Sequence, residues 1–143
     1  MSNLIKPPIT FWIIAAIALL WNLMGLAAFY SDMTITPESI AAMTPELQAY
    51  YENNPMWNKL AYGLAVIAGT LGGVALLMRK SWAVPLFIVS LVCVLANNVY
   101  TYLFSGVGSS ATASQVSLSA MVTLIAVFLW YYAKKAAARA WIG

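Results

Sequence analysis

Residues 58–104 read NKLAYGLAVIAGTLGGVALLMRKSWAVPLFIVSLVCVLANNVYTYLF. It holds two apolar runs, 58–78 and 82–104, separated only by Arg79-Lys80-Ser81. Each run is long enough to cross a hydrocarbon core of about 30 Å as a helix, which takes roughly 20 residues. Because the connection is so short, the two helices must be adjacent and antiparallel. The sequence therefore predicts a helical membrane hairpin.

Two further apolar runs, 9–30 and 115–135, flank this hairpin. The chain is 63% hydrophobic and 8% charged, whereas about a quarter of the residues of a soluble domain are charged. The first run exceeds the apolar core of a typical signal peptide, so we expect it to be retained as a helix. We predict a single all-α integral membrane domain over residues 1–143. Its fold is a four-transmembrane-helix up-down bundle with short external helices between the first two long helices.

Charged residues are segregated along the chain. Six of the seven basic residues lie at one set of helix ends. Lys6 precedes the first run, Arg79 and Lys80 separate the middle two, and the end of the last run and the residues after it hold Lys134, Lys135 and Arg139. Lys59 is the exception. Basic loops remain on the cytoplasmic side of a membrane. We therefore predict that both termini are cytoplasmic and that segments 31–57 and 105–114 are external. The 105–114 segment has the uncharged Gly/Ser composition of a linker.

Segment 31–57, which we call the cap, holds every carboxylate side chain of the protein: Asp32, Glu38, Glu46 and Glu52. Residues 36–38 and 44–46 both read Thr-Pro-Glu, a pattern typical of helix starts. Two short helices are therefore expected. The cap is either a solvated lid that helps orientation, or a docking surface for an external partner or a gate over a pocket.

Small residues follow one face of the second long run at steps of four. They are Ala61, Ala65, Gly69 and Gly73. Such a stripe lets helix backbones approach closely. It predicts either packing within the bundle or a seam between two copies of the chain.

No charged side chain lies deep in any of the four runs, and this argues against a proton-coupled carrier. The deep polar side chains are neutral. Asn22, Asn97 and Ser119 fall near one level, roughly 20 Å from the cytoplasmic side at the rise of a helix. We name as the polar seam these three residues and their neighbours Thr123, Tyr62 and Tyr100. The seam is either interhelical packing or a pocket for a small neutral solute or a lipid headgroup.

The residue types restrict the chemistry of the chain. There is no histidine, and Cys93 is the only cysteine, so His-containing zinc sites, haem ligation by histidine and an intrachain disulfide are excluded. Without paired deep carboxylates or an activated nucleophile, no usual acid-base or covalent catalytic site can be assembled. We predict that the protein is not an enzyme and that it needs no cofactor or metal. The basic, aromatic-tipped stretch 134–142 is expected to continue the last helix and to anchor it to anionic lipid.

Several segments together resemble a group of short, uncharacterised inner-membrane proteins of bacteria, some of which carry a loose sugar-transporter label. These segments are 21–25 (WNLMG), 43–46 (MTPE), 51–57 (YENNPMW), 69–72 (GTLG), 79–86 (RKSWAVPL) and 131–135 (YYAKK). The resemblance implies a bacterial inner-membrane location. The transporter label implies a substrate path, for which the polar seam is the candidate. Since four helices leave little room for an alternating-access cavity, transport would require an oligomer.

Two functions are consistent with these features. The first is a small non-catalytic inner-membrane protein that binds a partner or lipid through its acidic cap. The alternative is an oligomeric transporter or channel for a small neutral solute such as a sugar. The expected partners are membrane lipids and either further copies of the chain or a membrane or periplasmic protein, and no nucleic acid is expected.

Overall fold

The computed structural model describes residues 4–104 and 113–143. This part of the chain is helical and contains no strand. Its elements are α1 (Ile9–Met33), α2 (Pro37–Ala41), α3 (Pro45–Asn53), α4 (Met56–Leu77), α5 (Ala83–Val99), the π-helix η1 (Tyr100–Phe104) and α6 (Ala113–Ala138). Among the described residues, four helical spans are long and apolar enough to cross a membrane. They confirm the prediction of four long apolar helices.

The boundaries differ from the predicted ones in a few places. α1 extends to Met33, and α6 covers 113–138 in place of 115–135. The predicted helix 82–104 is divided into α5 and η1. The change to the wider π-helix follows directly after Asn97 and Asn98, whose amides bond to two different helices. The predicted linker 105–114 falls almost entirely outside the described residues.

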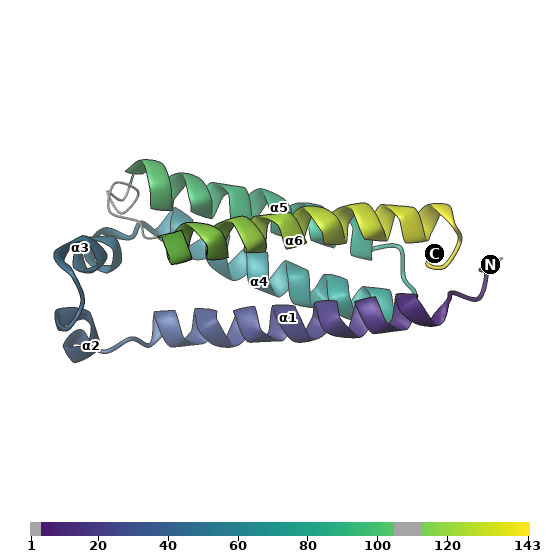
Figure 1. The fold of residues 1–143 in the computed structure, drawn as a ribbon, viewed down its shortest axis with the longest axis horizontal. Coiled ribbons are helices and arrows are strands. Elements are labelled where there is room, and N and C mark those ends of the chain that lie inside the picture. Colours follow the sequence, from purple (N-terminus) through teal and green to yellow (C-terminus); the bar gives the residue numbers. More distant parts are fainter. Residues whose placement is uncertain (1–3, 105–112) are drawn as a thin grey trace.

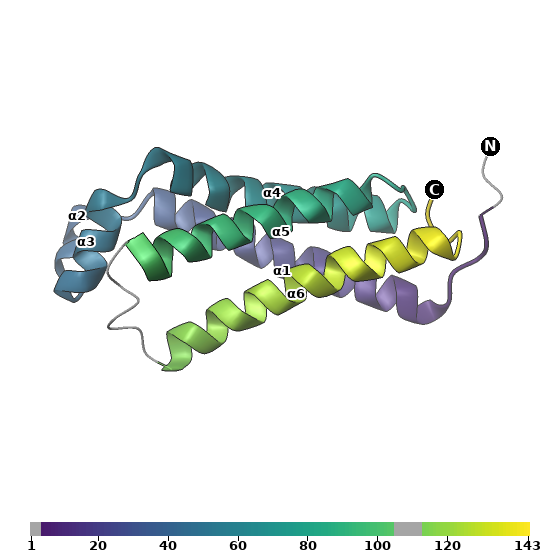
Figure 2. The same ribbon diagram turned by 90° about the horizontal axis from the view of Figure 1, so that it is seen from above.

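The four long helices lie side by side (Figure 1), with α2 and α3 at one end and both ends of the described chain at the other. α4 is the central helix, since it packs against both α1 and α5 and half of its apolar span is buried. α6 packs mainly on α5. Figure 2 shows α6 crossing the bundle at an angle, so that its first turns lie away from α5. The bundle is therefore more closely packed at one end than at the other.

The stripe of small residues explains the central place of α4. All four of its members are buried: Ala61, Ala65, Gly69 and Gly73. A Cβ atom added to Gly73 would lie 3.1 Å from the Cα atom of Leu19 on α1, and one added to Gly72 would lie 2.8 Å from the Phe87 ring on α5. These distances leave no room for a side chain. The stripe therefore serves packing within the chain in this structure.

Both short helices of the cap begin at the predicted threonines. The hydroxyl of Thr36 accepts a hydrogen bond from the backbone N–H of Ser39 at 3.2 Å, and that of Thr44 accepts one from Leu47 N–H at 3.4 Å. A proline occupies the first turn of each helix. The side chains therefore satisfy backbone donors that a helix start leaves unpaired.

At the opposite end, Arg79 connects three separate parts of the chain. Its Nε donates to the carbonyl of Trp141 at 2.9 Å, and an Nη donates to the carbonyl of Ile5 at 2.8 Å. Its own carbonyl accepts from the N–H of Gly143 at 3.1 Å. We call Arg79, residues 4–8 and residues 139–143 the Arg79 junction. It ties the chain start and the chain end to the turn between α4 and α5.

This junction corrects the prediction for the C-terminal stretch. α6 ends at Ala138 and Ala140 has a φ of 59°, so the chain reverses instead of continuing as a helix. The Trp141 ring lies 6.0 Å from that of Phe11, and Ile142 is only 2% exposed. The predicted helix through residue 142 is therefore wrong, whereas anchorage of the basic residues to anionic lipid stays a prediction.

Candidate functional site

A cavity of about 420 Å³ lies between the long helices, and we call it the interhelical cavity. Its volume falls within the range of about 300 to 1,000 Å³ that is usual for small-molecule sites. α1, α4, α5 and α6 all contribute to its lining, which consists of Trp21, Asn22, Met24, Gly25, Ala28, Tyr62, Ala65, Val66, Phe87, Ser90, Val94, Asn97, Asn98, Leu118, Ser119, Val122, Ile125, Ala126 and Leu129. The lining is mainly apolar, with a few neutral polar groups.

One wall of the cavity is a close junction of α1, α4 and α5. Asn22 Nδ2 donates to its own helix, at the carbonyl of Ala18 at 2.8 Å. A Cβ atom on Gly69 would lie 2.1 Å from Asn22 Oδ1 and 3.3 Å from Ser90 Oγ. Ser90 in turn donates to the carbonyl of Ala65 at 2.7 Å. These polar groups are thus engaged in packing the helices together, as is common for amides and hydroxyls in membrane bundles.

The second polar wall joins α5 to α6. Asn98 Nδ2 donates to Thr123 Oγ1 at 2.8 Å, and that hydroxyl donates to the carbonyl of Ser119 at 2.9 Å. The hydroxyl of Ser119 accepts a hydrogen bond from the Tyr102 phenol. Thr123 itself does not line the cavity, since it lies behind Asn98 as its partner.

A chain of amides links the cavity to the cap. Asn97 Nδ2 donates to Asn58 Oδ1 at 3.0 Å, and Asn58 Nδ2 donates to Asn54 Oδ1 at 2.7 Å. Asn58 is only 1% exposed, and the sequence analysis did not include it in the polar seam. Asn54 lies in the turn between α3 and α4, and Asn58 lies in the first turn of α4, so their contact depends on the geometry of this turn and has no clear sequence signal.

The two tyrosines of the polar seam have different surroundings. Tyr62 lines the interhelical cavity and its ring packs edge-on to Phe29 at 5.2 Å. Tyr100 does not line it, because its hydroxyl donates to the carbonyl of Tyr50 in α3 at 3.4 Å and its ring lies 5.8 Å from Trp57. The structure therefore brings together Asn22, Asn97, Ser119 and Tyr62, and assigns Tyr100 to the contact with the cap.

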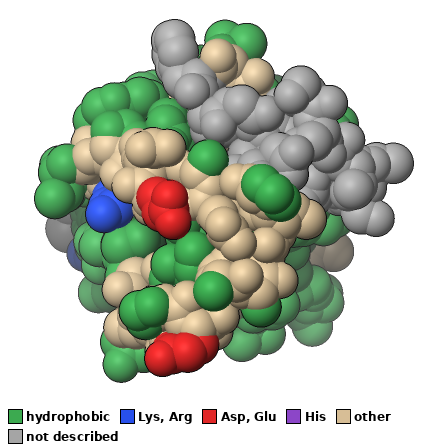
Figure 3. All heavy atoms as spheres, turned by 90° about the vertical axis from the view of Figure 1, so that its left-hand side faces the viewer, with side chains coloured by type: hydrophobic (Ala, Val, Ile, Leu, Met, Phe, Trp, Pro, Cys, Tyr) green, Lys and Arg blue, Asp and Glu red, His purple; other side chains and the backbone are tan. Residues whose placement is uncertain are grey.

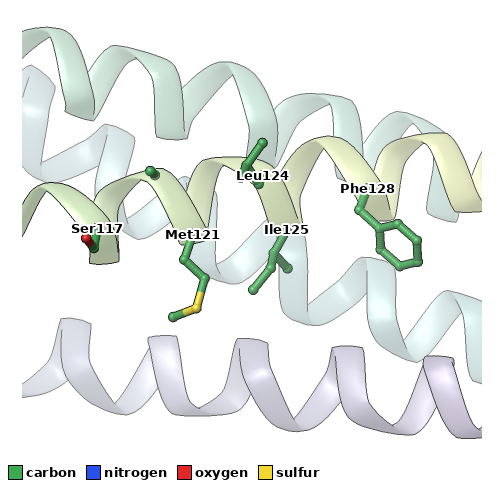
Figure 4. A pocket seen from close by; sticks show the side chains of 6 residues that line it. Ser117, Met121, Leu124, Ile125 and Phe128 are labelled. Atoms are coloured by element: carbon green, nitrogen blue, oxygen red, sulfur yellow. The ribbon is translucent and has the colours of Figure 1, made fainter.

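A shallower apolar groove of about 520 Å³ runs along α6. Figure 4 shows Met121, Ile125 and Phe128 extending from α6 on the side that faces α1. Ile125 lines both the groove and the interhelical cavity. The two hollows therefore meet on α6, and the combined surface between α1 and α6 is apolar.

The cap carries its acids at separate positions. Asp32 is half-buried and accepts a hydrogen bond from the Tyr51 phenol at 3.2 Å, whereas Glu38 and Glu52 are exposed. Burial and the adjacent Asp32 carboxylate raise the pKa of Tyr51 to about 12. Figure 3 views this end of the molecule, and the acidic side chains visible there do not form one patch. The side chain of Glu46 is outside the described part.

The chemistry that the cavity offers is hydrogen bonding without charge. Its lining contains no Asp, Glu, Lys or Arg. Within residues 4–104 and 113–143, no three acid or thiol side chains are grouped so that they could hold a metal ion. The cavity is therefore suited to a neutral ligand that is largely apolar.

Comparison with known proteins gives no further information, since no family model, no curated protein and no solved structure matches the chain. The resemblance to short inner-membrane proteins stays a prediction. The functional argument therefore rests on the geometry of the interhelical cavity and the cap.

Proposed function

We propose that this is a non-catalytic, multi-pass protein of the bacterial inner membrane that binds a lipid-like molecule between its helices. In this proposal the chain crosses the membrane up-down-up-down, with both termini in the cytoplasm and α2 and α3 outside. The positions of the basic residues support the orientation. The turn between α4 and α5, which holds Lys80, and the last turn of α6, which holds Lys135, lie at the end that carries both termini (Figure 1). The observation that carries the function is the interhelical cavity.

Lipid is favoured as the source of the ligand because of the position of the cavity. α6 packs mainly on α5, and its contact with α1 lies near the Arg79 junction, at Phe11 and Tyr132. In this proposal, the space between α1 and α6 nearer the cap faces the hydrocarbon of the membrane. The mouth carries apolar side chains from both helices: Met24 is 67% exposed and Leu118 is 57% exposed. A molecule already dissolved in the bilayer can enter without crossing water, whereas a sugar would have to cross this apolar rim.

In the same proposal, the cap is a lid at the external end of the bundle. Its two short helices contact the long helices through the hydrogen bond of Tyr51 to Asp32 in the last turn of α1 and through the packing of Tyr50 on Tyr100, whose rings are 5.4 Å apart, among other contacts. Glu38 and Glu52 remain exposed and provide an acidic surface for an external protein. Partner binding through the cap is thus compatible with lipid binding below it.

The test blocks the mouth of the cavity without disturbing its packing. Ala28 lines the cavity and is exposed, while Ala27 is exposed on the same helix but outside the lining. Ala28→Trp is therefore compared with Ala27→Trp. Native mass spectrometry of the purified full-length protein measures the lipid that stays bound after detergent exchange.

We expect bound lipid on the wild type and on Ala27→Trp, and about tenfold lower occupancy on Ala28→Trp, equivalent to about 1.4 kcal/mol. Equal occupancy on all three proteins would refute lipid binding at this site. A melting curve for each variant excludes unfolding as the cause. Uptake of a radiolabelled sugar into proteoliposomes, blocked by Ala28→Trp, would instead support the oligomeric transporter.

A further inference from the structure

We infer that the ligand of the interhelical cavity is an uncharged amphiphile with hydroxyl groups at its polar end, and that the side-chain carbonyl oxygens of Asn97 and Asn98 accept hydrogen bonds from these hydroxyls. The inference rests on the proposed binding function and adds the chemical class of the ligand. It follows from which hydrogen-bonding atoms the helices leave unused.

The orientation of the Asn98 amide is fixed by its partner. The hydroxyl hydrogen of Thr123 is directed to the carbonyl of Ser119, a group that can only accept. Thr123 Oγ1 must therefore accept from Asn98, and the atom at 2.8 Å from it is the Nδ2 donor. The carbonyl oxygen of Asn98 is left without a donor among the described residues, although Asn98 lines the cavity.

Asn97 leaves the same atom unused. Its Nδ2 donates to Asn58 Oδ1 at 3.0 Å, and no donor in the described part of the chain reaches its carbonyl oxygen. The phenol of Tyr62, which also lines the cavity, makes no hydrogen bond to any described residue. One helix thus offers two neighbouring acceptors, and α4 offers a hydroxyl that can donate or accept.

A ligand must match this set of atoms. Amide carbonyl oxygens need a donor, and leaving a buried acceptor unpaired costs about 1 to 3 kcal/mol. An ester or ketone has acceptors only, so it would leave both oxygens unpaired. A carboxylate or phosphate would bring a charge into a lining that has no cation, which is strongly unfavourable in a low-dielectric site. Each hydroxyl donates one hydrogen bond, so a polar end with two hydroxyls can satisfy both oxygens.

The apolar part of the ligand has a separate place. Phe87, Ile125 and Leu129 line the cavity on the side of the Arg79 junction. Phe87 and Asn98 lie on the same helix, about 16 Å apart along its axis at the usual helical rise. The cavity is thus polar toward the cap and apolar toward the Arg79 junction. An amphiphile fits with its hydroxyl end toward the cap and its chain toward the middle of the bundle.

The test uses three probes with the same acyl chain and the full-length protein in detergent. They are 1-monooleoylglycerol, which carries hydroxyls, methyl oleate, which carries only acceptors, and oleate, which is charged. Binding is measured by titration in native mass spectrometry. We expect 1-monooleoylglycerol to bind at least about tenfold more tightly than either of the others, a difference of about 1.4 kcal/mol.

Two variants test whether the amide side chains cause the preference for 1-monooleoylglycerol. Asn98→Leu should reduce the preference for 1-monooleoylglycerol over methyl oleate, because only the Asn97 oxygen remains as an acceptor on α5. Asn53→Leu, which changes an exposed amide at the end of α3, should leave the preference unchanged. The comparison of the three probes on the wild type needs no variant, so it decides the inference even if Asn98→Leu does not fold.

The outcomes separate the two proposals. If methyl oleate or oleate binds the wild type as tightly as 1-monooleoylglycerol, the hydroxyl inference is wrong, while loss of all binding in Ala28→Trp still supports the cavity as the site. If Ala28→Trp binds all three probes like the wild type, the proposed function itself fails. A hydroxyl preference in Asn98→Leu as large as that of the wild type would overturn the role of the Asn98 amide.

Discussion

The two ends of the bundle are held together in different ways. At the Arg79 junction, one guanidinium bonds two backbone carbonyls from the chain start and the chain end, and Phe11 and Ile142 are buried there. At the cap end, the contacts are side-chain hydrogen bonds among neutral amides, such as that between Asn97 and Asn58. The interhelical cavity is lined by the amides of Asn97 and Asn98, whereas no residue of the Arg79 junction lines it. The proposed binding cavity thus lies where side-chain oxygens of Asn97 and Asn98 have no hydrogen-bond donor among the described residues.

The contacts between α1 and α6 follow the same division. The rings of Phe11 and Tyr132 stack at 6.3 Å near the junction, so the two helices are connected there. Toward the cap, Met24 of α1 and Leu118 of α6 are both exposed. The helices are therefore joined at one end and separated at the other, and substitutions should affect the two ends differently.

The largest expected effect is that of Arg79→Ala. It removes both guanidinium hydrogen bonds and leaves the carbonyls of Ile5 and Trp141 without their donor. Hydrogen bonds to a charged group contribute about 1.5 to 3 kcal/mol, so we expect the free energy of unfolding to fall by about 3 kcal/mol. SDS or urea titration in bicelles measures it. Lys80→Ala, at an exposed neighbour, should change it by less than about 0.5 kcal/mol.

Comparison of Arg79→Gly with Arg79→Ala separates the effect of the lost guanidinium on stability from the effect of the backbone conformation at this position. Arg79 has a φ of 58°, a left-handed conformation that costs a residue with a Cβ atom about 1 kcal/mol and costs glycine almost nothing. The glycine variant should therefore be more stable than the alanine variant by about 1 kcal/mol. Equal stability of the two would show that the backbone carries no strain at this turn.

The second expected effect concerns the contact between α1 and α4. Gly73→Ala places a Cβ atom 3.1 Å from the backbone of Leu19, which cannot rotate away. Overpacking of this kind costs about 1 to 3 kcal/mol, and we expect about 2 kcal/mol. Gly25→Ala is the matched control, because its Cβ would meet only a methyl group of Val66 at 3.3 Å. If the two variants melt alike, the stripe does not set the distance between these helices.

Much of the fold could be predicted from the sequence because its signals are local. Runs of apolar residues gave the four long helices, and the Thr-Pro-Glu repeats gave the starts of α2 and α3. The Arg79 junction could not be predicted, because its hydrogen bonds join residues that are 62 and 74 positions apart. The basic residues of the C-terminal stretch suggested lipid anchorage. The burial of Ile142 could not be predicted, because the chain reverses at Ala140 and the sequence has no glycine there to signal a turn.

The site could be predicted in part. Depth along the helices placed Asn22, Asn97 and Ser119 at one level, since the rise per residue is constant, and all three line the interhelical cavity. Depth gives no information on which neighbour an amide faces, so it missed Asn58. It also assigned Tyr100 to the pocket although Tyr100 contacts the cap. Rotation about the helix axis depends on packing that only the structure provides.

A smaller effect is expected at the cap end, for Asn58→Leu. The substitution leaves Asn97 Nδ2 and Asn54 Oδ1 without their partner. Polar contacts between membrane helices contribute about 0.6 kcal/mol on average and at most about 1.7, so we expect a loss of about 1 kcal/mol. Unfolding in bicelles measures it, with Asn53→Leu as an exposed control. A loss as large as that of Arg79→Ala would contradict the proposed difference between the two ends.

The smallest effect is expected for Tyr51→Phe in the cap, and it should depend on pH. The variant loses one half-exposed hydrogen bond to Asp32, which is worth about 0.5 kcal/mol. In the folded protein the pKa of Tyr51 is about 12, above the value of about 10 for a free tyrosine, so folding favours the protonated phenol. Its contribution should therefore be fully present below pH 10 and should disappear as the pH rises to 12. The measurement is the difference in unfolding free energy between wild type and variant at pH 8 and at the highest pH at which both remain folded. A difference in unfolding free energy that stays constant or grows over this pH range would contradict this prediction. It would show that the hydrogen bond donated by the Tyr51 phenol to Asp32 does not stabilise the contact between α3 and α1.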